Sequence, residues 1–265
     1  MNHTEERNPR STHIDTMPLS DALALINDEN RRALDAVDAA LPQIGEVCLA
    51  MEASIHSGGR IFYVGAGTSG RLGVMDAAEC PPTFGVPREL FTGIIAGGIP
   101  CLTAAAEAQE DSAERGRADL VAAGVTGRDT VIGISASGGA AYVVAALEYA
   151  NEIGAYTAAL VNNPASPMEK VAQTTIMVDS GPEVITGSTR MKAGTTQKIV
   201  LNMLSTMAMV RCGYVYENMM VNLRPTNIKL RGRVIRIVRE ILGCDEETAV
   251  TRLEQADWNI RKAVE

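Results

Sequence analysis

Residues 62–84 have the sequence FYVGAGTSGRLGVMDAAECPPTF, which joins an apolar run to a loop of glycines and hydroxyl residues and then to a carboxylate. The apolar run Ile61–Val64 is typical of a buried strand. The glycines that follow permit a tight turn, and Thr68 and Ser69 add hydroxyls where the next helix presents unpaired N–H groups. Because such a helix start attracts anions, this stretch predicts a phosphate site between a strand and a helix.

Glu79 is the candidate acid of this stretch. It comes just before Cys80, Pro81 and Pro82, and the two prolines predict that the helix stops there. The partial negative charge at the end of a helix disfavours an ionised carboxylate, which suits a general acid. An ordinary exposed glutamate explains the position equally well, so the stretch by itself leaves both interpretations open.

Strand-like and helical segments alternate along the middle of the chain. The other apolar runs lie at 90–96, 130–135, 156–161 and 175–178, and the helical stretches between them at 70–79, 100–123, 140–153 and 166–172. This alternation predicts an α/β fold with a mostly parallel sheet that helices cover on both faces. Ligands of such folds bind beyond the carboxyl ends of the strands, so the loops at 65–70 and 135–139 are the first candidates for a site.

Both ends of the chain have helical patterns. From Pro18 to Leu49 apolar residues recur mostly three or four positions apart, a long Met- and Leu-rich helix is expected at 189–211, and another amphipathic helix at 227–241. The tail is similar to ubiquitin-associated helical modules, with short helices expected to start near Asp245 and Asp257. We expect an N-terminal arm and helix over 1–50, the α/β domain over 51–216 and a small helical module over 217–265.

The composition excludes several classes of protein. A chain of 265 residues that is 46% hydrophobic can bury a sizeable core, and its net charge of -8 argues against nucleic acid or an anionic membrane as the main partner. The five cysteines are scattered without metal-binding spacing, so neither a disulfide framework nor a metal site is expected. No apolar signal core or window of about 18 apolar residues is present, which favours a cytoplasmic protein.

The segment Gly65–Gly70 formally matches the GxGxxG pattern of dinucleotide-binding folds. That function needs an acidic residue at the end of the second strand to hold a ribose hydroxyl. Here Glu89 precedes the strand, and the residues 97–99 that follow it carry no carboxylate. A dinucleotide site is therefore disfavoured, and no cofactor is expected.

Two further loops combine glycine with hydroxyl residues. Ser135-Ala136-Ser137-Gly138 follows an expected strand, and Thr186–Arg190 opens the long helix, which Ser188 or Thr189 is expected to cap. Three such clusters are more than helix caps require, and together they predict a sugar-phosphate pocket. The candidate binding residues are Gly67, Thr68, Ser69, Ser135, Ser137, Gly138, Ser188, Thr189 and Arg190, with Arg71, Lys192 and Lys198 as further sources of positive charge.

A second acidic cluster contains Glu107, Glu110 and Asp111. Glu107 and Glu110 are three residues apart, so a helix would place them side by side. From the spacing alone, a solvated helix face is the favoured interpretation.

The segments GAGTSGRLGVMDAAECPPTFGVP, GPEVITGSTRMKAGTTQK and LNMLSTMAM, together with TEERNPRSTHID near the N-terminus, resemble the N-acetylmuramic acid 6-phosphate etherases. The resemblance runs from about residue 4 to the end. It implies a three-layer sandwich of the sugar isomerase (SIS) type, a sugar-phosphate substrate and a homodimer whose active site takes residues from both subunits. The same motifs resemble the glucokinase regulatory protein, a non-enzymatic relative with two such domains.

The resemblance also implies a reaction. The family cleaves the lactyl ether of its substrate by elimination and water addition; Glu79 matches its catalytic acid, and Glu110 its second catalytic carboxylate, which we assign as the base at carbon 2. A sugar-phosphate-binding regulator without turnover and an aldose–ketose isomerase remain alternatives. The chain departs from the family where Gly139-Ala140-Ala141 replaces Arg-Thr-Pro and where Asn222 replaces Asp. The loss of polar groups at 139–141 predicts weaker substrate binding or a different sugar.

Overall fold

The computed structural model describes residues 3–104, 109–222, 225 and 228–264. A sheet of five parallel strands in the order β2-β1-β3-β4-β5 forms its centre. The strands are β1 (Ile61–Gly65), β2 (Phe91–Ile95), β3 (Thr130–Ser135), β4 (Tyr156–Val161) and β5 (Thr174–Met177). Each begins and ends within one residue of its expected bounds, and the predicted α/β fold is confirmed.

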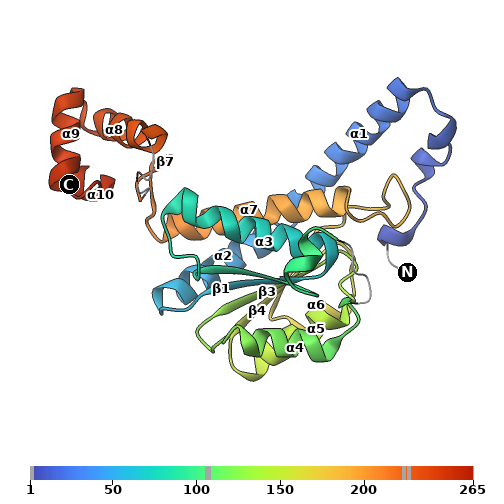
Figure 1. The fold of residues 1–265 in the computed structure, drawn as a ribbon. Helices are drawn as coiled ribbons and strands as arrows, with labels where there is room; N and C mark the ends of the chain where they lie inside the picture. The colour runs from blue at the N-terminus through green and yellow to red at the C-terminus, as the bar shows by residue number, and fades with distance from the viewer. Residues whose placement is uncertain (1–2, 105–108, 223–224, 226–227, 265) are drawn as a thin grey trace.

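Helices cover both faces of this sheet and make a three-layer sandwich (Figure 1). On one face lie α2 (Leu41–His56), α3 (Gly67–Phe84) and α7 (Lys192–Arg211), and on the other α4 (Ala113–Ala122), α5 (Ala141–Glu152) and α6 (Pro167–Val171). Neighbouring residues of β1 show why its apolar run is continuous. Tyr63 is buried in the first core and Phe62 in the second, because side chains of a strand alternate between two covered faces.

The helix after β1 was predicted to stop at the two prolines, and this prediction is wrong. Helix α3 runs through Pro81 and Pro82 to Phe84. Each proline removes one helical hydrogen bond but keeps a helical φ, and the last turn closes when the N–H of Gly85 donates to the Pro81 carbonyl (2.8 Å). Gly85 has a left-handed φ of 67° and ends the helix.

The helix expected over 100–123 is also wrong in its first half. A short 3-10 helix, η4 (Ile99–Leu102), takes its place, the described residues 103–104 and 109–112 are not α-helical, and α4 begins only at Ala113. Its cap is Ser112, whose hydroxyl accepts from the Arg115 N–H. Glu110 therefore lies in a turn rather than on a helix face, and Glu107 lies outside the described residues.

The N-terminal segment forms three 3-10 turns, η1 (His3–Glu5), η2 (Pro9–Ser11) and η3 (Ile14–Thr16), before a long helix, α1 (Leu19–Asp38). Helix α1 is separate from α2 because the chain turns at 39–40, and Pro42 occupies the first turn of α2. Helix α1 extends away from the sheet at one end of the molecule (Figure 1), whereas η1 lies back against the sheet, where Thr4 contacts Asn163.

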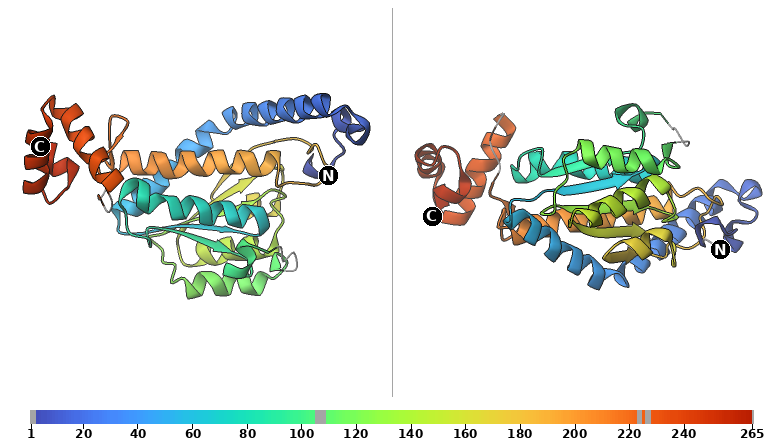
Figure 2. Two further views of the ribbon diagram at one scale, coloured as in Figure 1. Left: turned by 45° about the horizontal axis from the view of Figure 1, so that its top comes forward. Right: turned by 90° about the horizontal axis from the view of Figure 1, so that it is seen from below.

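The C-terminal helices lie at the opposite end (Figure 2). A small hairpin, β6 (Val215–Tyr216) and β7 (Met219–Met220), leads to α8 (Ile228–Leu242), α9 (Glu246–Gln255) and α10 (Ile260–Val264), which share a core of their own. Asp245 caps α9, but α10 begins at Ile260, later than expected, because Asp257 lies in a turn with a φ of 51°. None of the described helices is long and apolar enough to cross a membrane.

Candidate functional site

The loops after β1 and β3 leave the sheet side by side. In the sheet β1 lies between β2 and β3, so the chain continues to one side of β1 with β2 and to the other side with β3. Gly65 of β1 is paired with Ile134 of β3, so both chains turn away at the same edge. Parallel sheets bind ligands at such a switch point, and both candidate loops are at it.

The first loop enters α3 at once. Gly67, with a φ of 52°, is the first residue of the helix and is exposed, Thr68 is half-buried and Ser69 is buried. The Ser69 hydroxyl donates to the Gln197 side-chain oxygen on α7 (2.8 Å), so it supports the loop from inside the protein. Gly70 permits the close approach of α3 to the strand, because a Cβ there would lie 2.6 Å from the Gly65 carbonyl oxygen.

The second loop is a tight turn closed by its own hydroxyls. The Gly138 N–H donates to the Ser135 hydroxyl, and the Gly139 N–H to the Ser137 hydroxyl, each at 3.2 Å. Gly138 has a φ of 67°, and a Cβ there would lie 2.4 Å from the Cβ of Ser166. The two serines therefore hold the shape of this turn.

The third loop, Thr186–Arg190, precedes α7 but does not cap it. The N-cap position is Met191, and the buried carboxylate of Glu183 accepts from the backbone N–H groups of Lys192 (3.0 Å) and Ala193 (2.9 Å). Burial raises the pKa of Glu183, although these two hydrogen bonds oppose the shift. The capping role expected of Ser188 or Thr189 was thus wrong, because a carboxylate from outside the loop fills it.

The first and third loops meet at a hollow of about 300 Å³. It is lined by Thr68, Leu72, Arg190, Gly194, Thr195, Lys198 and Ile199. Arg190 and Lys198 are both exposed cations, and Thr68 contributes a hydroxyl from the start of α3. This combination of positive charge, a hydroxyl and a helix N-terminus can bind a phosphate. Ser135, Ser137 and Gly138 are not part of its lining.

A buried amide chain links these loops, and its members were not among the site residues predicted from the sequence. From Gln197 the side-chain amide donates to the Asn162 side-chain oxygen (2.9 Å), and the Asn162 N–H donates to the Ala136 carbonyl (3.0 Å). Asn163 donates to the same carbonyl (2.9 Å). The signal for these residues was available, because two asparagines directly follow the buried strand β4 at the ligand-binding edge.

Glu110 lies close to the second loop. Its carbonyl accepts from the N–H of Tyr142, in the first turn of α5, and its side chain is exposed. The Arg71 guanidinium on α3 donates to the carbonyls of Leu102 and Ala104, at 3.1 Å each, and so ties α3 to the segment before Glu110. The residues 139–141, where the chain departs from the family, open α5 at this place.

Glu79 lies far from the three loops within the chain. Twelve residues of α3 separate it from Gly67, which corresponds to about 18 Å along the helix axis. Its side chain is exposed. Within one subunit, Leu72 is the nearest residue of α3 that lines the hollow beside Thr68, and it is roughly 10 Å from Glu79 along the helix.

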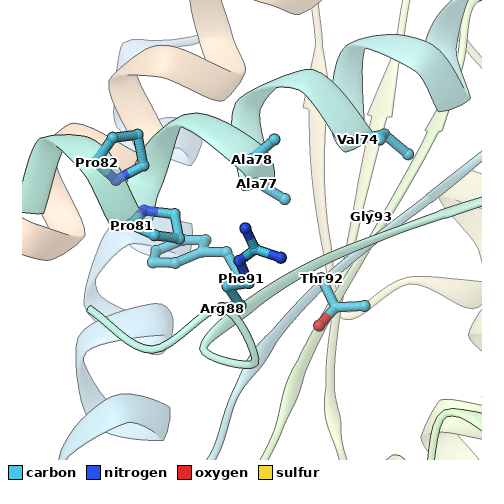
Figure 3. A pocket seen from close by; sticks show the side chains of 9 residues that line it. All are labelled: Val74, Ala77, Ala78, Pro81, Pro82, Arg88, Phe91, Thr92 and Gly93. Atoms are coloured by element: carbon cyan, nitrogen blue, oxygen red, sulfur yellow. The ribbon is translucent and has the colours of Figure 1, made fainter. Parts of the chain in front are cut away.

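A larger hollow, of about 590 Å³, lies beside the outer half of α3. Figure 3 shows its lining, with Ala77, Ala78, Pro81 and Pro82 from α3 facing Arg88, Phe91 and Thr92 from the edge strand β2 and the segment before it. Ala78 and Pro82 flank Glu79 on the helix, so this hollow lies next to the candidate acid. It is largely apolar, which distinguishes it from the hollow at Thr68.

Asp76, one turn before Glu79, fixes α3 against α7. Its carboxylate accepts from the Asn202 amide (2.6 Å) and the Ser205 hydroxyl (3.2 Å). Burial raises the pKa of Asp76, and the two hydrogen bonds oppose the shift. Within the described residues no group of three or more His, Cys, Asp and Glu side chains could hold a metal ion.

The parallel sheet and the hydroxyl loops at its carboxyl edge define a SIS domain. Residues 109–207 match the SIS domain model, and residues 43–151 match that of the glucokinase regulatory protein N-terminal SIS domain. The fold is similar to that of a phosphoheptose isomerase from Francisella tularensis (16% identity, 73% of this chain and 98% of that chain, TM-score 0.54). It is also similar to a phosphoheptose isomerase from Neisseria gonorrhoeae (20% identity, 74% of this chain and 99% of that chain, TM-score 0.54).

The sequence relatives are closer. The chain is 47% identical to the N-acetylmuramic acid 6-phosphate etherase of Cronobacter sakazakii, over 98% of this chain and 88% of the relative. It is 49% identical to the N-acetylmuramic acid 6-phosphate etherase of Edwardsiella ictaluri, over 98% of this chain and 87% of the relative. The chain belongs to the N-acetylmuramic acid 6-phosphate etherase family, which confirms the resemblance found in the sequence.

Proposed function

We propose that the protein is a carbon–oxygen lyase that cleaves the D-lactyl ether of N-acetylmuramic acid 6-phosphate. The products are N-acetylglucosamine 6-phosphate and D-lactate. The observation that carries this proposal is identity of 47–49% to the etherases over 98% of the chain. The presence of both Glu79 and Glu110 supports turnover, since a regulator that only binds the sugar needs the loops alone.

We place the phosphate of the substrate in the hollow beside Thr68. Arg190 and Lys198 supply positive charge there, and the first N–H groups of α3 point toward the same edge. The turn Ser135–Gly138 then faces the sugar, with Glu110 beside it. The hollow beside Thr68 then holds the phosphate end of the open-chain sugar, and the turn and Glu110 lie at carbons 2 and 3.

The reaction consists of an elimination followed by the addition of water, and each of these steps needs two proton transfers. Carbon 2 is next to the aldehyde, so its proton is acidic enough for the Glu110 carboxylate to remove. The bond from carbon 3 to the ether oxygen then breaks. Glu79 gives its proton to this departing oxygen, which becomes the hydroxyl of lactate. Water adds to carbon 3 of the unsaturated aldehyde while Glu79 takes its proton and Glu110 returns one to carbon 2. Each positioned transfer contributes roughly 10²- to 10⁴-fold.

We infer that Glu79 of the site comes from a second copy of the chain. The phosphorus of a hexose 6-phosphate is at most roughly 8 Å from carbon 2, for bonds near 1.5 Å. Within one subunit Glu79 is roughly 16 Å along α3 from Thr68, whose hydroxyl we assign to the phosphate, and roughly 10 Å from Leu72, the nearest residue of this helix that lines the hollow. A homodimer that brings α3 of the partner subunit to these loops removes the conflict.

The proposed setting is the cytoplasm, with a small sugar phosphate rather than nucleic acid or membrane as the partner. All five cysteines are free thiols, which suits a reducing compartment.

One incubation separates the three candidate functions. The protein is mixed with N-acetylmuramic acid 6-phosphate in deuterated water, and lactate and deuterium at carbon 2 of the sugar are measured. The etherase releases lactate and labels carbon 2. Label without lactate would identify an isomerase, and binding without either would identify a regulator.

Glu79→Gln is the matched variant for this experiment. It keeps the shape of the side chain but cannot protonate the leaving group, so lactate release is expected to stop. Release near the wild-type rate in this variant would remove Glu79 from the mechanism.

A further inference from the structure

The N-terminal segment 4–11, TEERNPRS, has no role in the reaction above, yet it is bound to the site. Thr4 is fully buried although it lies close to the chain terminus. Its N–H donates to the Asn163 side-chain oxygen (3.2 Å), and the Asn163 amide donates back to the Thr4 hydroxyl (2.9 Å). The same amide donates to the carbonyl of Ala136, between Ser135 and Ser137 (2.9 Å). Thr4 therefore supports the second loop through a single side chain.

The segment also holds the third loop. The Asn8 amide donates to the Pro182 carbonyl (3.1 Å), and the Ser11 hydroxyl donates to the Val184 carbonyl (2.7 Å). The Glu5 carboxylate lies over Gly187, where a Cβ would be 3.0 Å from its oxygen. These contacts lie on both sides of Glu183, which caps α7.

A buried ion pair anchors the segment to α7. The Lys192 ammonium lies 2.6 Å from the Glu29 carboxylate of α1, and both side chains are almost fully buried. Asn8 (2.8 Å) and Arg10 (2.6 Å) donate to the same carboxylate. Because a buried charge that loses partners is costly, the segment cannot leave without destabilising the start of α7.

We propose that residues 4–11 are a positioning element of the sugar-phosphate site, with Thr4 as its positioning residue. The segment holds the turn Ser135–Gly138 and the loop Thr186–Arg190 in fixed positions relative to each other, so that both contact one substrate. It does so through hydrogen bonds and not through contact with the substrate. This inference rests on the proposed function for its ligand.

The variant Thr4→Val tests the inference. Valine keeps the shape of threonine but leaves the buried Asn163 amide with the Ala136 carbonyl as its acceptor and without the Thr4 hydroxyl. We expect KM for N-acetylmuramic acid 6-phosphate to rise about 10-fold with a smaller change in kcat, as expected for a loss of uniform binding. Thr4→Ser restores the acceptor and the wild-type KM. The control is Thr12→Val, because Thr12 is exposed and bonds only to carbonyls of its own segment.

A second measurement does not depend on turnover. Hydrogen exchange of the backbone N–H groups at 136–139 and 185–190 is recorded without substrate. It is expected to be faster in Thr4→Val than in the wild type, and unchanged in Thr12→Val. If the wild-type protein releases no lactate but exchange still rises, the proposed function fails and the positioning role stands.

Two results would overturn the inference. One is exchange at 136–139 and 185–190 that is as slow in Thr4→Val as in the wild type, and the other is a wild-type KM in an active Thr4→Val protein. Should Thr4→Val not fold, Ser11→Ala provides the same test. It removes the bond to Val184 and the longer bond to the Asn8 carbonyl within the segment (3.4 Å), so faster exchange at 185–190 supports the inference and unchanged exchange overturns it.

Discussion

The contacts of Asn222 give a physical reason for an asparagine at a position where the resemblance to the family implies an aspartate. Its amide donates to the Phe84 carbonyl (3.2 Å), one of the unpaired carbonyls at the end of α3. An ionised aspartate cannot donate this bond, and its charge would face the negative end of the helix. The asparagine therefore stabilises the end of the helix that carries Glu79.

Asn222→Asp is expected to lower the free energy of unfolding by about 1–2 kcal/mol at pH 7. The loss becomes smaller in acid, because a protonated carboxyl group can donate the hydrogen bond. Urea unfolding at pH 7 and in acid measures both. Asn218→Asp, an exposed position in the β6–β7 turn, makes the same chemical change as a control. Equal effects of the two variants would contradict this role of Asn222.

Glu29 links stability to pH. Burial alone would raise the pKa of Glu29, but hydrogen bonds from Lys192, Asn8 and Arg10 lower it from 4.5 to about 2. Between these values the unfolded chain binds a proton that the folded chain does not, so stability falls as pH falls through this window. The wild type is expected to lose about 3 kcal/mol there that Glu29→Gln does not lose.

Denaturant unfolding of both proteins at several pH values measures this difference. Glu29→Gln is less stable at pH 7, because it leaves Lys192 buried without a counter-charge. The gap between the two proteins should narrow between about pH 4.5 and pH 2. A constant gap would show that Glu29 does not hold its charge in the folded state.

At the level of elements, Arg71 connects α3 to the segment that leads to Glu110. Arg71→Ala removes its donors to Leu102 and Ala104. We expect kcat for lactate release to fall roughly 10- to 100-fold, because small displacements of a catalytic group have large effects on rate. Deuterium exchange at carbon 2 should slow in parallel, since Glu110 is the proposed base of that step. Arg128→Ala, on a remote exposed loop, is the control, and an equal loss there would refute the specific role of Arg71.

The strands were predictable from sequence because each is buried on both faces and thus continuously apolar. Segments fixed by distant contacts were not predictable in the same way. The positions of 99–104 and 109–112 depend on Arg71 and Tyr142, and the start of α7 depends on Glu183. The hydroxyl loops could be placed at one edge, since parallel strands carry their following loops there. The distance from Gly67 to Glu79 depends on the helix expected over 70–79 and not on the continuation of α3 through its prolines.

The whole molecule places its functional parts along α3. The hydroxyl loops and the N-terminal segment lie at the start of this helix, and Glu79 lies near the end that faces the C-terminal helices (Figure 2). Glu110 is on the side of the loops, through its carbonyl bond to Tyr142. The proposed site therefore combines Glu110 of one subunit with Glu79 of the other.

Two inactive variants test this arrangement when they are combined. Glu79→Gln and Glu110→Gln chains are co-expressed with different tags, and the mixed dimers are purified through both. If the two carboxylates of a site come from different subunits, each mixed dimer has one intact site and one site that lacks both. About half of the wild-type activity per dimer is then expected, because the two sites of a symmetric dimer are equivalent. Dimers of either variant alone remain inactive and serve as controls. Mixed dimers without activity would place both carboxylates in one subunit, and α3 would then have to bend or move to bring Glu79 to the phosphate site.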